Sequence, residues 1–282
     1  MPILPAVQRL VDRLLYERVR PLAARMQPGR FDAVARALAV AATPLVLATS
    51  PRETRAYLRQ IGVSAGPVHH LRFAYLKAVE RFRGDYVYLR PHDPILKGPG
   101  LRAFEETGEA AVMVGWSAYG MIGAARLAVE RGDRVVRYPY GGENGPAPDT
   151  IAPSERWAAF QAEVRTQLIQ PVQIVPGGSP LAYIRALRSG QSLIILQDVP
   201  EPEAPRRRLA GTERPLPVGA VRLAKAARVP IYAIDTSFRG GLLHIELDGP
   251  LDMDEQALLD RFSNKIREQP WAWTLWREFT GA

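Results

Sequence analysis

The chain of 282 residues contains no cysteine. This absence excludes disulfide bonds, thiolate metal sites and a cysteine nucleophile, and it agrees with a cytoplasmic protein. Lysine is scarce as well: four of the 37 basic residues are lysines and the other 33 are arginines. No run of 18 or more apolar residues occurs, and the most apolar stretch, residues 37–48, contains a proline. We therefore expect its apolar segments to be core helices or interfacial segments, because they are too short to span a bilayer.

The net charge is +8 and the sequence pI is about 10. A basic excess favours anionic partners, although a general bias of the sequence toward arginine explains it equally well. No nucleic-acid-binding motif accompanies the charge, so we expect no nucleic acid partner. Residues 1–30 carry six arginines and two acids around an apolar stripe. This pattern predicts an amphipathic helix that either contacts an anionic membrane surface or packs on its own domain.

The hydrophobic pattern divides the chain into two regions. Residues 1–85 read as helical, and residues 86–282 alternate short β-rich runs with helical stretches. We expect strands at residues 86–89, 111–115, 135–138, 172–175, 193–197, 231–234 and 243–247. We expect helices at residues 119–131, 154–168, 181–188, 218–227 and 254–267, and loops at 141–153 and 200–214. This alternation predicts an α/β domain with a mostly parallel central sheet flanked by helices, preceded by a helical N-terminal region.

Several sequence blocks follow one another in the second region. They are Pro-Gly-Gly-Ser at 176–179 before a helix, an apolar strand ending in Gln197-Asp198, Leu-Ala-Gly-Thr at 209–212, the helix start at 217–224, the strand at 229–234, and Pro-Trp-x-Trp-x-x-Trp at 270–276. From about residue 108 to 279, their order and spacing resemble the lipid A late-acyltransferase family, within the lysophospholipid acyltransferase superfamily.

The resemblance implies a peripheral protein on the cytoplasmic face of the inner membrane. Members of this family move a fatty acyl group from acyl carrier protein or acyl-CoA to a lipid or sugar hydroxyl. The family's catalytic block is a histidine after a strand, then four residues, then aspartate or glutamate. The histidine acts as general base on the acceptor hydroxyl, and the carboxylate orients its ring and stabilises the imidazolium. Neither a cofactor nor a metal is expected.

This chain departs from the family at that block. Trp116 stands where the histidine is expected, and Met121 stands where the acid is expected. Neither side chain accepts a proton near neutral pH. None of the four histidines is followed by an acid five positions later. The usual mechanism therefore cannot run through these positions, and two interpretations stay open: a binding protein for lipid, acyl thioester or protein, or an active transferase with an unusual base.

Two substitutes for the missing base come from the sequence. His92 lies in a proline-rich loop and is the more plausible rescuing base. Ser117 lies in Gly-Trp-Ser-Ala-Tyr, which nearly matches the Gly-x-Ser-x-Gly turn of serine hydrolases, and Asp198 and His244 follow it in the order of a hydrolase triad. His244 alternates along its strand with acids and is expected to face solvent. An esterase-like hydrolase is accordingly the lesser alternative.

The remaining candidates are ligand-binding positions. The backbone of Gly177, Gly178 and Ser179 precedes a helix and could bind a phosphate or an oxyanion, although a helix-capping turn is the plainer interpretation. Arg137 could contact a phosphate or carboxylate head group. Asp198 ends a strand, where α/β proteins place ligands. The resemblance adds two further residues to this set, Gly211 and Thr212. The tryptophans at 271, 273 and 276 suit either a membrane interface or the core.

Overall fold

The computed structural model describes residues 18, 20–23, 25–49, 51–90, 92–117, 122–136, 163, 173–174, 180–200, 203–217 and 219–274. Its helices are α2 (Arg20–Ala23), α3 (Pro28–Thr49), α4 (Pro51–Gln60), α5 (Pro67–Leu89), α6 (Pro99–Thr107), α7 (Ile122–Arg131), α9 (Pro180–Arg188), α10 (Gly219–Ala227) and α11 (Glu255–Glu268). Its strands are β1 (Leu96–Lys97), β2 (Val112–Gly115), β3 (Arg134–Val136), β4 (Gln173–Ile174), β5 (Leu193–Leu196), β6 (Arg206–Leu209), β7 (Thr212–Pro215), β8 (Ile231–Arg239) and β9 (Leu242–Asp248).

Prolines mark the starts of many of these helices. Five helices begin at a proline, namely at Pro28, Pro51, Pro67, Pro99 and Pro180. Proline suits the first helical position because its missing N–H would have no helical partner there, and its fixed φ already matches the helix.

Seven strands form the central sheet in the order β1-β9-β8-β2-β5-β3-β4. The five strands from β8 to β4 run parallel to one another. Strand β9 is antiparallel to β8, and β1 runs parallel to β9 at the sheet edge. The prediction of an α/β fold with a mostly parallel sheet flanked by helices is confirmed. All four residues of β2 are buried, as expected of a central strand covered on both faces.

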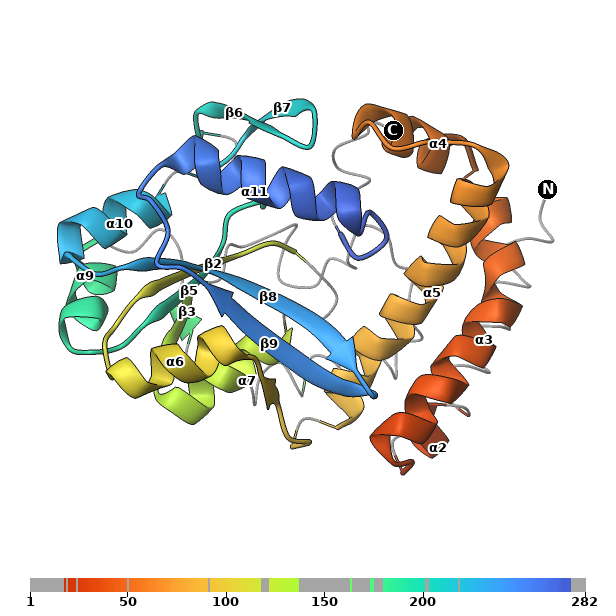
Figure 1. Ribbon diagram of the computed structural model, residues 1–282, viewed down its shortest axis with the longest axis horizontal. Helices are drawn as coiled ribbons and strands as arrows, with labels where there is room; N and C mark the ends of the chain where they lie inside the picture. The colour runs from red at the N-terminus through yellow and green to blue at the C-terminus, as the bar shows by residue number, and fades with distance from the viewer. Residues whose placement is uncertain are drawn as a thin grey trace.

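Helices cover both faces of the sheet (Figure 1). One core cluster joins the strands to α4, α9, α10 and α11, and it contains the fully buried Trp116 and Trp273. A second cluster lies on the other face against α6 and α7. A third, smaller cluster joins α3 to α5. The carboxyl ends of the parallel strands therefore open between helices from both layers, where α/β proteins commonly bind ligands.

The helical N-terminal region is packed into the same core as the sheet. Tyr57 and Leu58 of α4 and Phe73 of α5 belong to the cluster that contains the β-strand residues. The Tyr57 hydroxyl also donates a hydrogen bond of 3.1 Å to the carbonyl of Pro270. The division of the chain at residues 85 and 86 remains a prediction, and these contacts tie the two parts together.

Two local predictions were wrong. Residues 86–89 are the end of helix α5 instead of a strand, and Val87 packs into the second core cluster. A short apolar run does not by itself distinguish a strand from the end of a buried helix. Within 200–214, predicted as a loop, β6 and the start of β7 form a hairpin. Its turn places Ala210 and Gly211 at φ values of 50° and 85°, a conformation typical of tight hairpin turns. The helix predicted at 154–168 lies outside the described residues, apart from the helical Glu163.

In the part of the chain that the structure describes, no helix combines enough length and apolar character to cross a membrane.

Candidate functional site

Trp116, at the position that the resemblance assigns to the catalytic histidine, directly follows β2. Its side chain is 2% exposed and belongs to the core cluster on the α11 side of the sheet. The indole Nε1–H donates a hydrogen bond of 3.2 Å to Oδ1 of Asp235 on the neighbouring strand β8. A bulky ring with only a donor therefore fills the place where the resemblance would put a proton acceptor.

A pocket of about 320 Å³ lies beside Trp116, between strands β8 and β9 and helix α11. The volume is within the range of small-molecule sites. Its lining combines apolar and aromatic groups with five charged side chains: Trp116, Ala233, Ile234, Asp235, Glu246, Leu247, Asp248, Arg261, Phe262 and Lys265. The pocket is therefore amphipathic, and its charged groups suit a polar head group better than a saturated chain.

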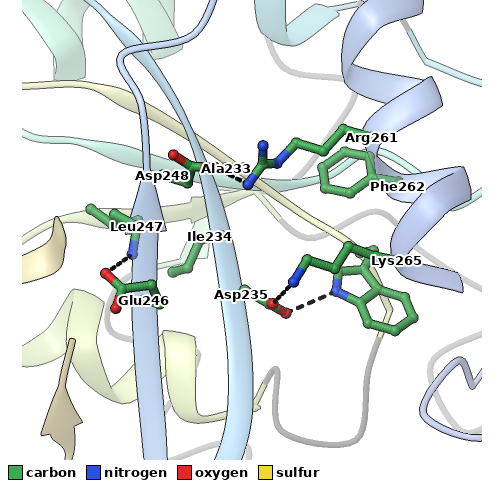
Figure 2. Close-up of a pocket in the computed structure, with 10 residues that line it drawn as sticks. Ala233, Ile234, Asp235, Glu246, Leu247, Asp248, Arg261, Phe262 and Lys265 are labelled. Atoms are coloured by element: carbon green, nitrogen blue, oxygen red, sulfur yellow. Dashed lines mark hydrogen bonds and ion pairs between the residues drawn. The ribbon is translucent and has the colours of Figure 1, made fainter. Parts of the chain in front are cut away.

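Ion pairs organise the charged wall (Figure 2). The Lys265 ammonium lies 3.0 Å from Oδ2 of Asp235, whose other oxygen accepts from Trp116. The Arg261 guanidinium forms a second ion pair, with the Asp248 carboxylate. Glu246 points toward the start of α6, where its Oε1 accepts a hydrogen bond of 2.7 Å from the backbone N–H of Gly100. Glu246 thus serves the N-terminus of α6, while the two ion pairs border the cavity.

The ion pair between Asp235 and Lys265 should contribute little to stability. Both side chains are about one-third exposed, at 32% and 31%, so water screens their attraction. We expect Lys265→Met to change the free energy of unfolding by less than about 1 kcal/mol. Urea denaturation followed by circular dichroism checks this. A loss of several kcal/mol would show that Lys265 supports the core, and pocket variants could then not be used as probes of binding.

Ser117 and Asp198 meet at the carboxyl ends of β2 and β5. The fully buried Asp198 carboxylate accepts hydrogen bonds from the Ser117 backbone N–H (2.8 Å), the Ser117 hydroxyl (2.9 Å) and the Trp273 indole N–H (2.7 Å). The Ser117 carbonyl accepts in turn from the backbone N–H and hydroxyl of Thr274. Burial raises the pKa of the Asp198 carboxyl, and these hydrogen bonds lower it by less. This network anchors the C-terminal segment to two central strands.

The third member of the predicted hydrolase order lies elsewhere. His244 is on β9, separated from β2 by β8, and its Nδ1 is 3.4 Å from the Ser237 hydroxyl. Within the described residues, no hydrogen bond joins His244 to Ser117 or Asp198. The expectation that His244 faces solvent was wrong: it is 5% exposed, and because residues 243–245 are all buried, both faces of β9 are covered there. Burial lowers the pKa of the His244 imidazole.

The other predicted substitute, His92, is exposed in the turn before β1. The neighbouring Asp93 forms an ion pair with Arg90, and its carbonyl accepts from Arg126 of α7. Among the residues that the structure describes, no hydrogen bond connects His92 with Trp116 or Ser117. His92 is therefore not brought to the position after β2, whereas Ser117 lies there and its hydroxyl donates to Asp198 instead of to a histidine.

The predicted ligand-binding residues fall into three groups. Gly211 and Thr212 form the turn and start of the β6–β7 hairpin, where the Gln60 amide donates to the Thr212 hydroxyl and a side chain at Gly211 would collide with the Gln60 carbonyl. Their observed contacts are thus with the end of α4. Asp198 accepts its hydrogen bonds from Ser117 and Trp273, as described above. The remaining predicted ligand-binding positions, Arg137, Gly177, Gly178 and Ser179, lie outside the described residues, as do Met121 and Trp276.

The sequence reasoning missed the charged residues of the pocket. Asp235 directly follows the segment predicted as a strand at 231–234, so an acid near a strand end was one available signal. Lys265 and Arg261 lie on the predicted amphipathic helix and are separated by one turn, which places them on the same face. Nothing in the sequence indicates that this face covers β8, because that depends on the sheet order.

Within the same described ranges, no group of three or more histidine, aspartate or glutamate side chains is placed to hold a metal ion. In comparisons with known proteins, no family model matches the chain. A search of curated proteins likewise finds no significant match.

Proposed function

We propose that this chain is an acyltransferase-like protein that binds a lipid or an acyl thioester without the usual transfer chemistry. The observation that carries the proposal is the buried Trp116, which stands where the resemblance puts a proton acceptor and whose only polar side-chain atom donates to Asp235. The α/β sheet agrees with the lysophospholipid-acyltransferase-like fold that the sequence blocks suggest. The protein would act peripherally on the cytoplasmic face of the inner membrane.

The pocket beside Trp116 supports a binding role. Its ion pairs offer both a carboxylate and cationic groups, while Phe262 and Ile234 supply apolar wall. A lipid head group or the polar part of an acyl thioester presents this combination of charge and apolar surface. A protein partner remains a further candidate occupant, and binding experiments with purified ligands separate it from the two chemical ones.

A second candidate function is an active acyltransferase with a non-standard base. The observation that favours it is the Asp235 carboxylate, which lies at the pocket within hydrogen-bonding distance of Trp116. In such an enzyme Asp235 would take the proton from the acceptor hydroxyl as that oxygen attacks the thioester carbonyl, and the thiolate would leave and be protonated. Lys265 would have to release Asp235 for this step, which is one reason to favour the binding role.

Thioester turnover tests the two functions. The purified protein is incubated with labelled acyl-CoA or acyl carrier protein thioesters, with and without a bacterial lipid extract, and free thiol and labelled lipid are followed. We expect the native protein to show no turnover above the background, because both oxygens of Asp235 are engaged, one by Lys265 and the other by Trp116. We expect equilibrium binding of the labelled thioester or of a short-chain lipid in the same samples.

Two variants make the outcomes distinct. Trp116→His with Met121→Glu restores the family's residue types, and transfer activity appearing in this variant alone would support a retained acyltransferase site. Native turnover that is lost in Asp235→Asn would establish the second function and contradict the first. Absence of both turnover and binding in the native protein would contradict both.

A further inference from the structure

The exposed face of α4 and the first turns of α5 form one surface, which we call the α4–α5 corner. It contains Arg52, Arg55 and Arg59 of α4, and Val68 and Leu71 of α5, all of them exposed. Figure 1 places α4 and the start of α5 at one end of the molecule, at the upper right, with β3 and the rest of the labelled sheet to their left. The opposite face of α4 packs into the main core, so the arginine face is the one left to solvent.

The corner carries an unusual pair of apolar side chains. Val68 is 74% exposed and Leu71 is 52% exposed, and three positions along a helix place them on the same side. Single exposed apolar residues are normal on protein surfaces and need no explanation. In the described part of the chain, the other large apolar residues with such exposure, including Val40 and Leu181, have no comparable neighbour within one helical turn.

The same corner carries positive charge that is not neutralised by ion pairs among the residues that the structure describes. No ion pair within the described residues neutralises Arg52, Arg55 or Arg59. Burial and, after it, the charge of Arg55 lower the pKa of His70, which places Arg55 close to the first turns of α5. The guanidinium of Arg72, the next residue after Leu71, lies 5.4 Å from the ring centre of Trp271. Apolar and cationic groups thus share one surface.

We infer that the α4–α5 corner docks on an anionic lipid bilayer. Arginine side chains bind lipid phosphates, and Val68 and Leu71 reach the boundary between head groups and acyl chains. A nucleic acid would match the charge, but it offers no place for two protruding apolar side chains. The inference deepens the proposed function, on which it rests, because a protein that takes a lipid or acyl ligand from a membrane needs a surface that faces it.

Vesicle binding by the full chain tests this surface. The protein is mixed with sucrose-loaded vesicles of phosphatidylcholine containing phosphatidylglycerol, or of phosphatidylcholine alone, and the sedimented fraction gives the partition coefficient. We expect native binding only to the anionic vesicles, with a decrease as salt is raised. We expect Val68→Ser with Leu71→Ser to weaken partitioning about 10-fold or more. Replacing the three α4 arginines by glutamine should have an effect at least as large.

Control variants test whether vesicle binding depends on these particular residues or on any exposed apolar and arginine side chains of the same kind. Val40→Ser with Leu181→Ser removes two side chains of similar exposure, 64% and 57%, from α3 and α9. Arg206→Gln, Arg208→Gln and Arg222→Gln together remove three exposed arginines from the hairpin and α10. Both controls should bind vesicles as the native protein does. All the substituted side chains are exposed, and a thermal melt of each variant confirms that it is folded.

Three results would overturn the inference: native protein that ignores anionic vesicles, corner variants that bind like the native protein, or control variants that lose binding equally. Binding that survives the corner variants would move the membrane contact to another basic segment, such as residues 1–30. The proposed function is judged separately, from the soluble thioester and short-chain lipid in vesicle-free solution. Ligand binding without vesicle binding would agree with the proposed function and contradict only the inference that the α4–α5 corner docks on a membrane.

Discussion

Replacing Asp198 by alanine should lower the free energy of unfolding by about 3 to 5 kcal/mol. The carboxylate is fully buried and accepts three hydrogen bonds, two from Ser117 and one from the Trp273 indole. Alanine would leave all three donors without a partner in the interior, and each unsatisfied buried donor costs about 1–3 kcal/mol. Urea denaturation monitored by tryptophan fluorescence measures the loss.

Asparagine at the same position is the matched control. Its carbonyl oxygen can accept from the Ser117 backbone and from Trp273, and its amide can donate to the Ser117 hydroxyl. The network is then kept without the charge, so we expect a much smaller loss for Asp198→Asn than for Asp198→Ala. Equal losses in the two variants would show that the cost comes from the altered packing volume instead of the lost acceptors.

The native protein and Asp198→Asn should also differ in how their free energies of unfolding depend on pH. Burial raises the pKa of Asp198 above the value it has in the unfolded chain. Between those two pKa values the folded protein holds a proton that the unfolded chain has released, so the contribution of Asp198 to stability falls as pH rises through this window. The stability of Asp198→Asn relative to the native protein should therefore improve with rising pH, as measured by urea denaturation at several pH values. If the stability of Asp198→Asn relative to the native protein instead falls with rising pH, the hydrogen bonds lower the pKa of Asp198 by more than burial raises it.

Local pattern was enough to predict the central elements of the fold. Strands β2, β5 and β9 are close to their predicted positions because they are short apolar or alternating runs between turn signals. Helix α11 was found from its amphipathic spacing, and its Asp254 cap accepts from the Ala257 backbone as a helix start requires. These features depend on residues within one segment, which the sequence displays directly.

Features that depend on distant segments were missed. Strand β1 is only two residues long and exists through its pairing with β9, so no pattern marks it. His244 is buried because both faces of β9 are covered around it, which the alternation within the strand does not reveal. The site shows the same limit: the contacts of Trp116 with Asp235, and of Asp235 with Lys265, join β2, β8 and α11, which are far apart in the chain. The sequence shows that Trp116 and Met121 stand where the resemblance places a histidine and an acid, whereas it does not show the pocket beside Trp116.

The second large effect is expected at Trp116. Its side chain is 2% exposed in the main core cluster, so Trp116→Ala should lower the free energy of unfolding by about 3 to 5 kcal/mol through lost burial and a new cavity. Trp116→Phe keeps most of the packing and removes the hydrogen bond to Asp235, and about 1–2 kcal/mol is expected for it. Thermal and urea denaturation of both variants measures the two contributions.

These stability losses bear on the test of function, because Trp116→His is itself a large-to-small substitution in the core. The restored-histidine variant should lose stability to a degree between phenylalanine and alanine, and its transfer assay belongs at a temperature where denaturation shows it folded. If Trp116→Ala proves nearly as stable as the native protein, the indole does not support the core. Trp116 would then serve as a replaceable wall of the pocket, and ligand binding, more than stability, should change when it is removed.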